Sequence, residues 1–397
     1  MRRAGRERVP AERPAADRPG HAAGRLGNRR SAGTGTGWAA AAAAVILALS
    51  MLLSACAAGG GKAGAAGPGN AGGVNAAGHD GSGAGSGGNG AAASGPSDGS
   101  RTESGRAPVT VRIGYQKYGT LNILKADGRL DRRLEELGYR AEWTEFPGGP
   151  QLLEELNVGS IDIGHTGEAP PIFAQAAGAP LVYLAHEPPS PKSEALLVPK
   201  DSDIRTAADL RGKKVALNKG SNVHYLLVKL LEQAGVGYDE IEPVYLPPAD
   251  GRAAFESGKV DAWVIWDPFF AAAETATGAR IVADGTDLVH NHEFFLGERS
   301  FVERHPDVID IILEEADRID AWAKDHPREL AELLSPQLGI DVPSLERAAG
   351  RRQYGVRRIG PEVLEAQQRI ADTFRALGLI PVDIRVEEAT VPTASGQ

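Results

Sequence analysis

Two stretches of this sequence share one plan, and that plan decides the fold. The first is GSIDIGHTGEAPPIFAQAAGA at residues 159–179, and the second is GKVDAWVIWDPFFAAAETATGA at residues 258–279. Each has a glycine, an aliphatic–aspartate pair, a β-like run, a polar corner and a helix with proline near its start. A repeated strand–corner–helix unit predicts two similar α/β lobes.

The flanking sequence continues this alternation. β-like runs at residues 109–116 and 139–146 enclose a stretch at residues 124–138 that predicts one helix ending at Gly138, and a helical tail begins near residue 301. Alternating strands and helices are typical of α/β folds, in which ligands bind at the carboxyl ends of strands. If the lobes face each other, both polar corners line one cleft.

The expected organisation has four parts. These are a signal peptide at residues 1–55, a lipidated tether at residues 56–107, one lobe from residues 108–200 plus 290–397, and a second lobe from residues 201–289.

The N-terminal part has the features of an export signal. Residues 1–55 carry nine arginines and three acidic residues, and residues 31–61 carry no charge. The apolar run Trp38–Leu53 is typical of a signal h-region and is shorter than the roughly 20 residues of a membrane span. The run ends in LSAC, which resembles the lipobox of bacterial lipoproteins and makes Cys56 the expected lipidation site. The alternative is a short anchor helix with an incidental cysteine.

Composition excludes several other classes of protein. Cys56 is the single cysteine, which excludes an intramolecular disulfide and a cysteine metal cluster. Residues 57–107 contain 18 glycines and no Phe, Trp or Tyr, a composition too poor in apolar groups for a packed core. The chain beyond residue 55 has a formal charge of −15, which argues against a nucleic-acid partner.

The corner GHTGE leaves two interpretations open. His165 and Glu168 form an acid–base pair, or the corner is a cradle that holds a ligand. Thr166 is a candidate helix cap, and the backbone N–H groups near Gly167 and Glu168 suit an anion at a helix start. No nucleophile accompanies the pair nearby, so we favour the cradle.

Three other segments end predicted strands with polar or aromatic groups. Tyr115 and Gln116 end the first strand, and Ser221 or Asn222 begins a helix after NKG. In AWVIWDPFF the two tryptophans are three apart and face opposite sides of a strand. We therefore expect one tryptophan in the core and the later one, Trp266, in the cleft.

A few side chains remain ambiguous on sequence grounds. Asp267 is a helix cap or a ligand contact, Glu187 belongs to the cleft or to a hinge, and His224 is more typical of a packed helix residue than of a ligand. The histidines show no metal spacing, and the chain lacks a phosphate-binding P-loop, a G-x-S-x-G elbow and a dinucleotide fingerprint. We expect neither metal nor cofactor, and binding rather than catalysis.

Together these motifs resemble the aliphatic sulfonate-binding proteins of ABC importers. The resemblance rests on IGYQKYG, GSIDIGHTGEAPPIFAQAAG, NKGSNVHYLLV and GKVDAWVIWDPF, and it is strong over residues 109–288 and weak in the tail. It implies a type II periplasmic-binding fold, with two α/β lobes joined by two crossovers. It also implies that the expected ligand-binding residues line the cleft: Tyr115, Gln116, Thr166, Gly167, Glu168, Ser221, Asn222, Trp266 and Asp267.

The resemblance implies a function outside the cytoplasm. We expect a monomeric, lipid-anchored receptor that captures an aliphatic sulfonate by lobe closure and delivers it to a permease coupled to a cytoplasmic ATPase. The alternatives are a binder of taurine, nitrate or a thiamine-pyrimidine precursor, an enzyme of the thiamine-pyrimidine synthase type, and the effector domain of a transcription regulator. No DNA-binding module precedes the body, which argues against the regulator.

Overall fold

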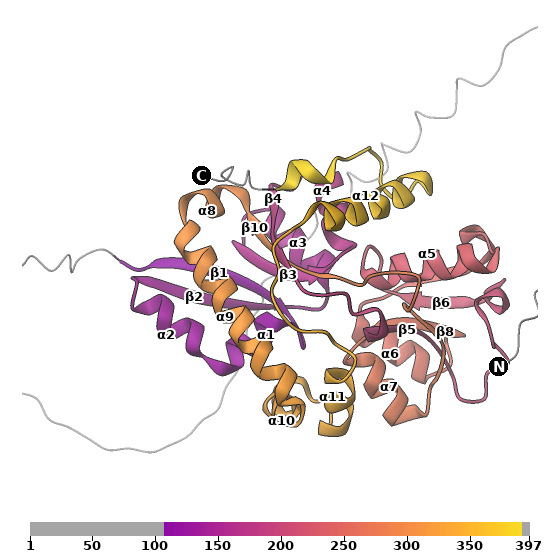
Figure 1. The fold of residues 1–397 in the computed structure, drawn as a ribbon. Helices are drawn as coiled ribbons and strands as arrows, with labels where there is room; N and C mark the ends of the chain where they lie inside the picture. The colour runs from indigo at the N-terminus through magenta and orange to yellow at the C-terminus, as the bar shows by residue number, and fades with distance from the viewer. Residues whose placement is uncertain (1–106, 391–397) are drawn as a thin grey trace, which may run out of the picture. The chain divides into compact units, whose positions relative to one another are not determined.

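The computed structural model describes residues 107–390, which form two α/β lobes with a five-stranded sheet in each (Figure 1). The predicted signal peptide, Cys56 and the glycine-rich tether lie outside the described residues. Within residues 107–390, no helix is both long and apolar enough to span a bilayer.

Lobe 1 has the strand order β2-β1-β3-β10-β4. Its strands are β1 (Val109–Gln116), β2 (Tyr139–Phe146), β3 (Ile163–Gly167), β4 (Leu181–His186) and β10 (Glu293–Glu298). All pair in parallel except β10, which runs antiparallel to both of its neighbours. Phe294 and Phe295 of β10 face opposite sides of the sheet, and neither is exposed to solvent, so helices must cover both faces.

Lobe 2 repeats this plan with the order β7-β6-β8-β5-β9. Its strands are β5 (Glu194–Val198), β6 (Lys214–Leu217), β7 (Glu242–Tyr245), β8 (Ala262–Trp266) and β9 (Arg280–Asp284). Here β5 is the antiparallel strand. The repeated stretches lie on β3 and β8, the central strands of the two sheets, which confirms the prediction of two similar lobes.

The chain passes between the lobes through two crossovers, at residues 187–193 and 285–292. The first leads into β5 of lobe 2, and the second leads back into β10 of lobe 1. The sequence placed the first lobe boundary at residue 200, and this position is wrong because β5 pairs with β8 and β9 of lobe 2. An apolar strand buried on both faces carries no local mark of the sheet to which it belongs. The predicted fold of two lobes and two crossovers is otherwise confirmed.

Helices cover both faces of each sheet. They are α1 (Thr120–Asp127), α2 (Arg129–Glu135), α3 (Gly149–Asn157) and α4 (Pro170–Ala176) in lobe 1, and α5 (Asn222–Ala234), α6 (Pro248–Glu256) and α7 (Phe269–Thr277) in lobe 2. Short 3₁₀ turns are η1 (Pro191–Ser193), η2 (Ala207–Leu210), η3 (Tyr238–Glu240) and η4 (Val386–Ala389). The single helix predicted over residues 124–138 is wrong, because Gly128 adopts a φ of 67° and separates α1 from α2.

The helical tail contacts both lobes. It comprises α8 (Arg299–Arg304), α9 (Pro306–Asp325), α10 (Pro327–Leu338), α11 (Val342–Ala349) and α12 (Pro361–Ala376). The helices α9 and α10 pack on α1, whereas α11 packs on α7 of lobe 2 (Figure 1). Phe374 of α12 packs against Phe173 of lobe 1 and His224 of lobe 2. The tail was expected within lobe 1, but it spans the two.

Candidate functional site

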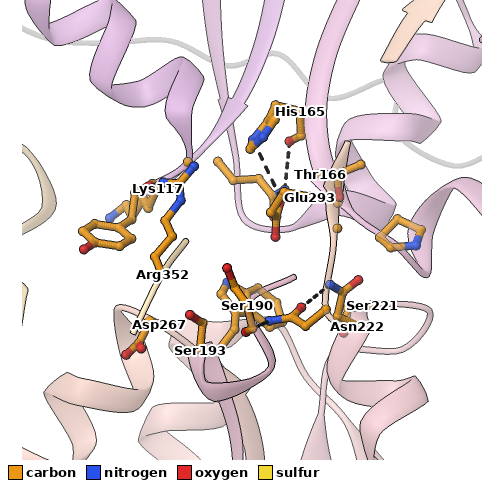
Figure 2. Close-up of a pocket in the computed structure, with 18 residues that line it drawn as sticks. Lys117, His165, Thr166, Ser190, Ser193, Ser221, Asn222, Asp267, Glu293 and Arg352 are labelled. Atoms are coloured by element: carbon orange, nitrogen blue, oxygen red, sulfur yellow. Dashed lines mark hydrogen bonds and ion pairs between the residues drawn. The ribbon is translucent and has the colours of Figure 1, made fainter. Parts of the chain in front are cut away.

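A cavity lies between the lobes, where the carboxyl ends of β1, β3 and β8 meet the two crossovers (Figure 2). The cavity and the solvent-filled space at its opening together occupy about 720 Å³. Its lining residues are Gln116, Lys117, Tyr118, Gly119, Gly149, His165, Thr166, Gly167, Pro170, Ser190, Ser193, Ser221, Asn222, Trp266, Asp267, Asn291, Glu293 and Arg352. This is the position at which open α/β sheets bind ligands.

Most of the residues expected to bind a ligand line this cavity. They are Gln116, Thr166, Gly167, Ser221, Asn222, Trp266 and Asp267. Tyr115 is not among the lining residues, because its buried ring packs edge-on against Trp143 with Lys125 above it. Glu168 also lies outside the lining.

Glu168 connects the corner GHTGE, called the first corner below, to the second crossover. Its buried carboxylate accepts hydrogen bonds from the backbone N–H groups of Asn291, at 3.1 Å, and His292, at 3.0 Å. Burial raises the pKa of Glu168 to about 7, although the two hydrogen bonds act in the opposite direction. Glu168 therefore holds the shape of the cleft without facing it.

The first corner is capped from the opposite lobe. Thr166 belongs to β3, and α4 begins only after Ala169, so the expected Thr166 cap is wrong. The N–H of Ala169 instead donates to Asn222 Oδ1 of lobe 2, at 3.0 Å. A Cβ atom on Gly167 would lie 2.1 Å from Asn222 Nδ2, so only glycine permits this approach. Gly167 and Asn222 thus join the lobes at the cleft.

The second corner, at Trp266 and Asp267, confirms the prediction that one tryptophan lies in the core and the other in the cleft. Trp263 is 1% exposed and packs in the core, whereas Trp266 lines the cavity. Asp267 lines the cavity and also caps α7, since its Oδ1 accepts a hydrogen bond from the N–H of Ala271 at 3.0 Å. Burial raises the pKa of Asp267 to about 7, and the neighbouring Arg351 opposes this increase.

The start of α5 presents polar groups without a side-chain cap. Ser221 occupies the N-cap position, but its hydroxyl donates to the Asn218 carbonyl at 2.6 Å. His224 is buried, with its Nδ1 accepting from the Gly220 N–H and its Nε2 lying 2.9 Å from the Tyr238 hydroxyl. Burial lowers the pKa of His224 to about 4. This is a neutral, packed histidine, as the sequence favoured.

The first crossover adds hydroxyl and amide donors. Ser193 Oγ is buried and has no hydrogen-bond partner among the residues described. Ser190 Oγ accepts from the Gln353 N–H at 2.9 Å, and Asn291 links Ser190 to Asn222 through its side-chain amide (Figure 2). Lys117 brings an ammonium group whose Nζ lies 3.9 Å from Glu145. Several neutral donors and one cation suit a ligand with a single, spread negative charge.

His165 and Glu168 do not form an acid–base pair. The His165 imidazole instead lies between two other carboxylates, with Nε2 at 2.9 Å from Glu187 Oε1 and Nδ1 at 3.8 Å from Glu293 Oε2. Burial lowers the pKa of His165, but the Glu187 carboxylate outweighs it and the net pKa is raised. Within residues 107–390, no group of three or more His, Cys, Asp and Glu side chains is placed to hold a metal ion.

Comparison with known proteins gives the family. A family model described as NMT1/THI5 like matches residues 145–330. An aliphatic sulfonates-binding protein of Escherichia coli strain K12 is 45% identical over 284 residues, which cover 70% of this chain and 88% of that protein. The chain belongs to the aliphatic sulfonate-binding protein family. This confirms the resemblance that the sequence motifs indicated.

A solved structure of another sulfonate-binding protein shares the fold of this chain. The alkanesulfonate-binding protein SsuA from Xanthomonas axonopodis pv. citri, solved bound to MOPS, is 39% identical, with a TM-score of 0.69 over 72% of this chain and 99% of that chain. An enzyme is a more distant relative: 2'-hydroxybiphenyl-2-sulfinate desulfinase of Rhodococcus erythropolis is 24% identical over 57% of this chain and 77% of its own length.

The cavity lining also includes a residue that the sequence did not predict, Arg352. Arg352, in the loop after α11, donates to both Glu187 carboxylate oxygens, at 2.7 and 2.8 Å, and both side chains are buried. Burial alone would raise the pKa of Glu187, but Arg352 and His165 lower it to about 2. The two partners are 165 residues apart in the chain, so no local pattern could have paired them.

Proposed function

We propose that this chain binds an aliphatic sulfonate in the cleft between its lobes and delivers it to an ABC permease coupled to a cytoplasmic ATPase. The observation that carries the proposal is the donor set of the cleft, in a member of the sulfonate-binding family. Hydroxyl, amide and ammonium groups from both lobes surround the cavity, and the guanidinium of Arg352 is already paired with Glu187.

The chemistry of a sulfonate suits this donor set. A sulfonate is a tetrahedral head with one negative charge spread over three acceptor oxygens. Ser193 Oγ has no hydrogen-bond partner within the described part of the chain, and Thr166 and Lys117 also line the cavity. Backbone N–H groups at the start of α5 add donors that have no partner within the helix. Trp266 offers an apolar wall for the carbon chain.

Lobe closure explains how binding would be signalled. Asn222 of lobe 2 contacts the Ala169 N–H and the Asn291 side chain of the second crossover, at 3.0 and 2.5 Å. A ligand that bridges the same elements stabilises the closed arrangement over an open one. A permease can then distinguish the loaded protein by the surface of the closed form.

The proposal places the protein outside the cytoplasm, as a monomer held at the bacterial membrane by a lipid on Cys56. Support comes from the family, which includes periplasmic members, and from the LSAC motif after an apolar run. The Cys56→Ala variant should not incorporate labelled fatty acid. Incorporation equal to that of the unsubstituted chain would contradict the lipid anchor and leave the sulfonate site unaffected.

A tryptophan titration tests the binding function directly. Trp266 lines the cavity, whereas Trp322 lies on α9, so an alkanesulfonate should change the intrinsic fluorescence of the natural chain and of Trp322→Phe. The change should be largely lost in Trp266→Phe. No saturable change with any sulfonate, alongside a clear change with nitrate or a pyrimidine, would contradict the proposal in favour of the alternative ligands.

A catalytic role is the second candidate, and the desulfinase relative is the observation that favours it. We propose binding rather than turnover because the His165–Glu168 pair is not formed. Incubation with aryl sulfinates and alkanesulfonates, followed by assay for released sulfite, distinguishes the two. Sulfite released in proportion to protein concentration would establish an enzyme.

A further inference from the structure

One carboxylate in the cleft is left without a hydrogen bond by its protein neighbours. Glu293 is the first residue of β10, and its side chain is 32% exposed. His165 Nδ1 lies 3.8 Å from Glu293 Oε2, which is too long for a hydrogen bond, and no other residue in 107–390 donates one to this carboxylate. Both oxygens of Glu293 therefore remain available to a ligand.

Apart from Lys117, whose ammonium group faces the cavity, the other strongly charged groups of the lining are already engaged. Arg352 forms a bidentate pair with Glu187, and Asp267 accepts from the Ala271 N–H while facing Arg351. Their hydrogen-bonding capacity is directed to the protein. Glu293 is different, because the described residues direct no hydrogen-bond donor to its carboxylate oxygens. Burial raises the pKa of Glu293, and the neighbouring His165 opposes this increase.

Glu293 occupies a central place in the cleft. Figure 2 shows its side chain between His165 on one side and the segment from Ser190 to Ser193 on the other. Its backbone carbonyl accepts a hydrogen bond from the Glu187 N–H at 2.8 Å, and β10 is paired on both sides. The residue is thus held on rigid elements, and a ligand that fills the cavity must meet its carboxylate.

The chemistry of this contact restricts the ligand. A sulfonate offers acceptors, and so does a carboxylate, so the two groups repel each other when both are ionised. A ligand that carries an amine or hydroxyl on its carbon chain can place a donor against the carboxylate while its sulfonate meets the hydroxyl and amide groups. Such hydrogen bonds to a carboxylate are short and strong, and a ligand without the donor leaves the carboxylate desolvated and unpaired.

We propose that Glu293 is a specificity-determining residue that selects sulfonates with an amine or hydroxyl donor on the carbon chain over plain alkanesulfonates of equal length. This inference rests on the proposed sulfonate-binding function. It names the subclass of sulfonate that the cleft accepts.

Calorimetry of the full chain with three sulfonates of equal length tests the inference. The ligands are ethanesulfonate, 2-hydroxyethanesulfonate and 2-aminoethanesulfonate. The natural chain should bind at least one of the donor-bearing ligands about tenfold or more tightly than ethanesulfonate. Glu293→Gln should reduce this ratio to below about threefold, while ethanesulfonate is bound as tightly as before or more tightly.

Glu303→Gln is the matched control, since it removes the same charge from an exposed position on α8. It should leave all three affinities unchanged. Retained ethanesulfonate binding shows that Glu293→Gln is folded, and the ranking by the natural chain tests the inference without any variant. Equal affinities for the three ligands, or a preference that survives Glu293→Gln, would overturn it. Failure of the natural chain to bind any sulfonate would instead overturn the proposed function.

Discussion

Replacing Arg352 with methionine should destabilise the fold strongly, because it leaves the Glu187 carboxylate buried without its main partner. Arg352 and Glu187 are 9% and 1% exposed, and their contact is bidentate. Removing one member of a buried pair typically costs about 3–5 kcal/mol. Arg352 is also the largest of the contacts that lower the pKa of Glu187, so its removal should raise that pKa.

This loss converts into a measurable shift of the melting temperature. A folded region the size of residues 107–390 unfolds with an entropy of about 0.6 kcal/mol/K. Arg352→Met should therefore lower Tm by about 5–8 °C. Differential scanning calorimetry at pH 7 measures the shift. Arg375→Met is the matched control, since its pair with Asp383 is exposed, and its loss should cost at most about 1 kcal/mol.

A double variant identifies the cause of the destabilisation. If the cost of Arg352→Met is an unpaired buried charge, then adding Glu187→Gln should restore at least half of the lost stability. Two results would refute this reasoning: a Tm loss no larger than that of Arg375→Met, or a double variant less stable than Arg352→Met alone.

Two further predictions concern the two corners of the cleft. Gly167→Ala should weaken sulfonate binding by about tenfold or more, because the new methyl group collides with Asn222. Gly350→Ala is the control and should bind the sulfonate normally, because the Cβ added there makes only ordinary contacts. Equal affinities of the two variants by calorimetry would contradict this prediction. Stability should fall as pH rises from about 4 to 7, because Glu168 and Asp267, with folded pKa values of about 7, retain protons that the unfolded chain releases. Glu168→Gln should flatten this slope in thermal melts, and an unchanged slope would argue against it.

Much of the fold could be predicted because its signals are local. The strand at residues 109–116 carries a period-2 pattern, and the repeated units at residues 159–179 and 258–279 each begin with a glycine and contain a strand followed by a helix. The corners that follow central strands necessarily approach a common cleft. For this reason Thr166 and Trp266 could be placed at the cavity from sequence alone.

The rest depends on contacts between distant segments. The affiliation of β5 with lobe 2 is set by its pairing with β8 and β9, which a buried apolar run does not reveal. Glu168 resembles a cleft residue in sequence but turns to the backbone of the second crossover. The pairing of Arg352 with Glu187 is a property of the assembled tail, so it became visible only in the structure.

Isothermal titration of the full chain with a short alkanesulfonate, against sulfate and nitrate, tests the central claim most directly. The claim is that the cleft between the lobes binds the sulfonate head through donors from both lobes. The account predicts saturable one-to-one binding of the sulfonate, weakened about tenfold or more in Gly167→Ala, and weaker or no binding of the inorganic anions. Binding of nitrate or sulfate as tight as that of the sulfonate, or no binding of any sulfonate, would contradict it.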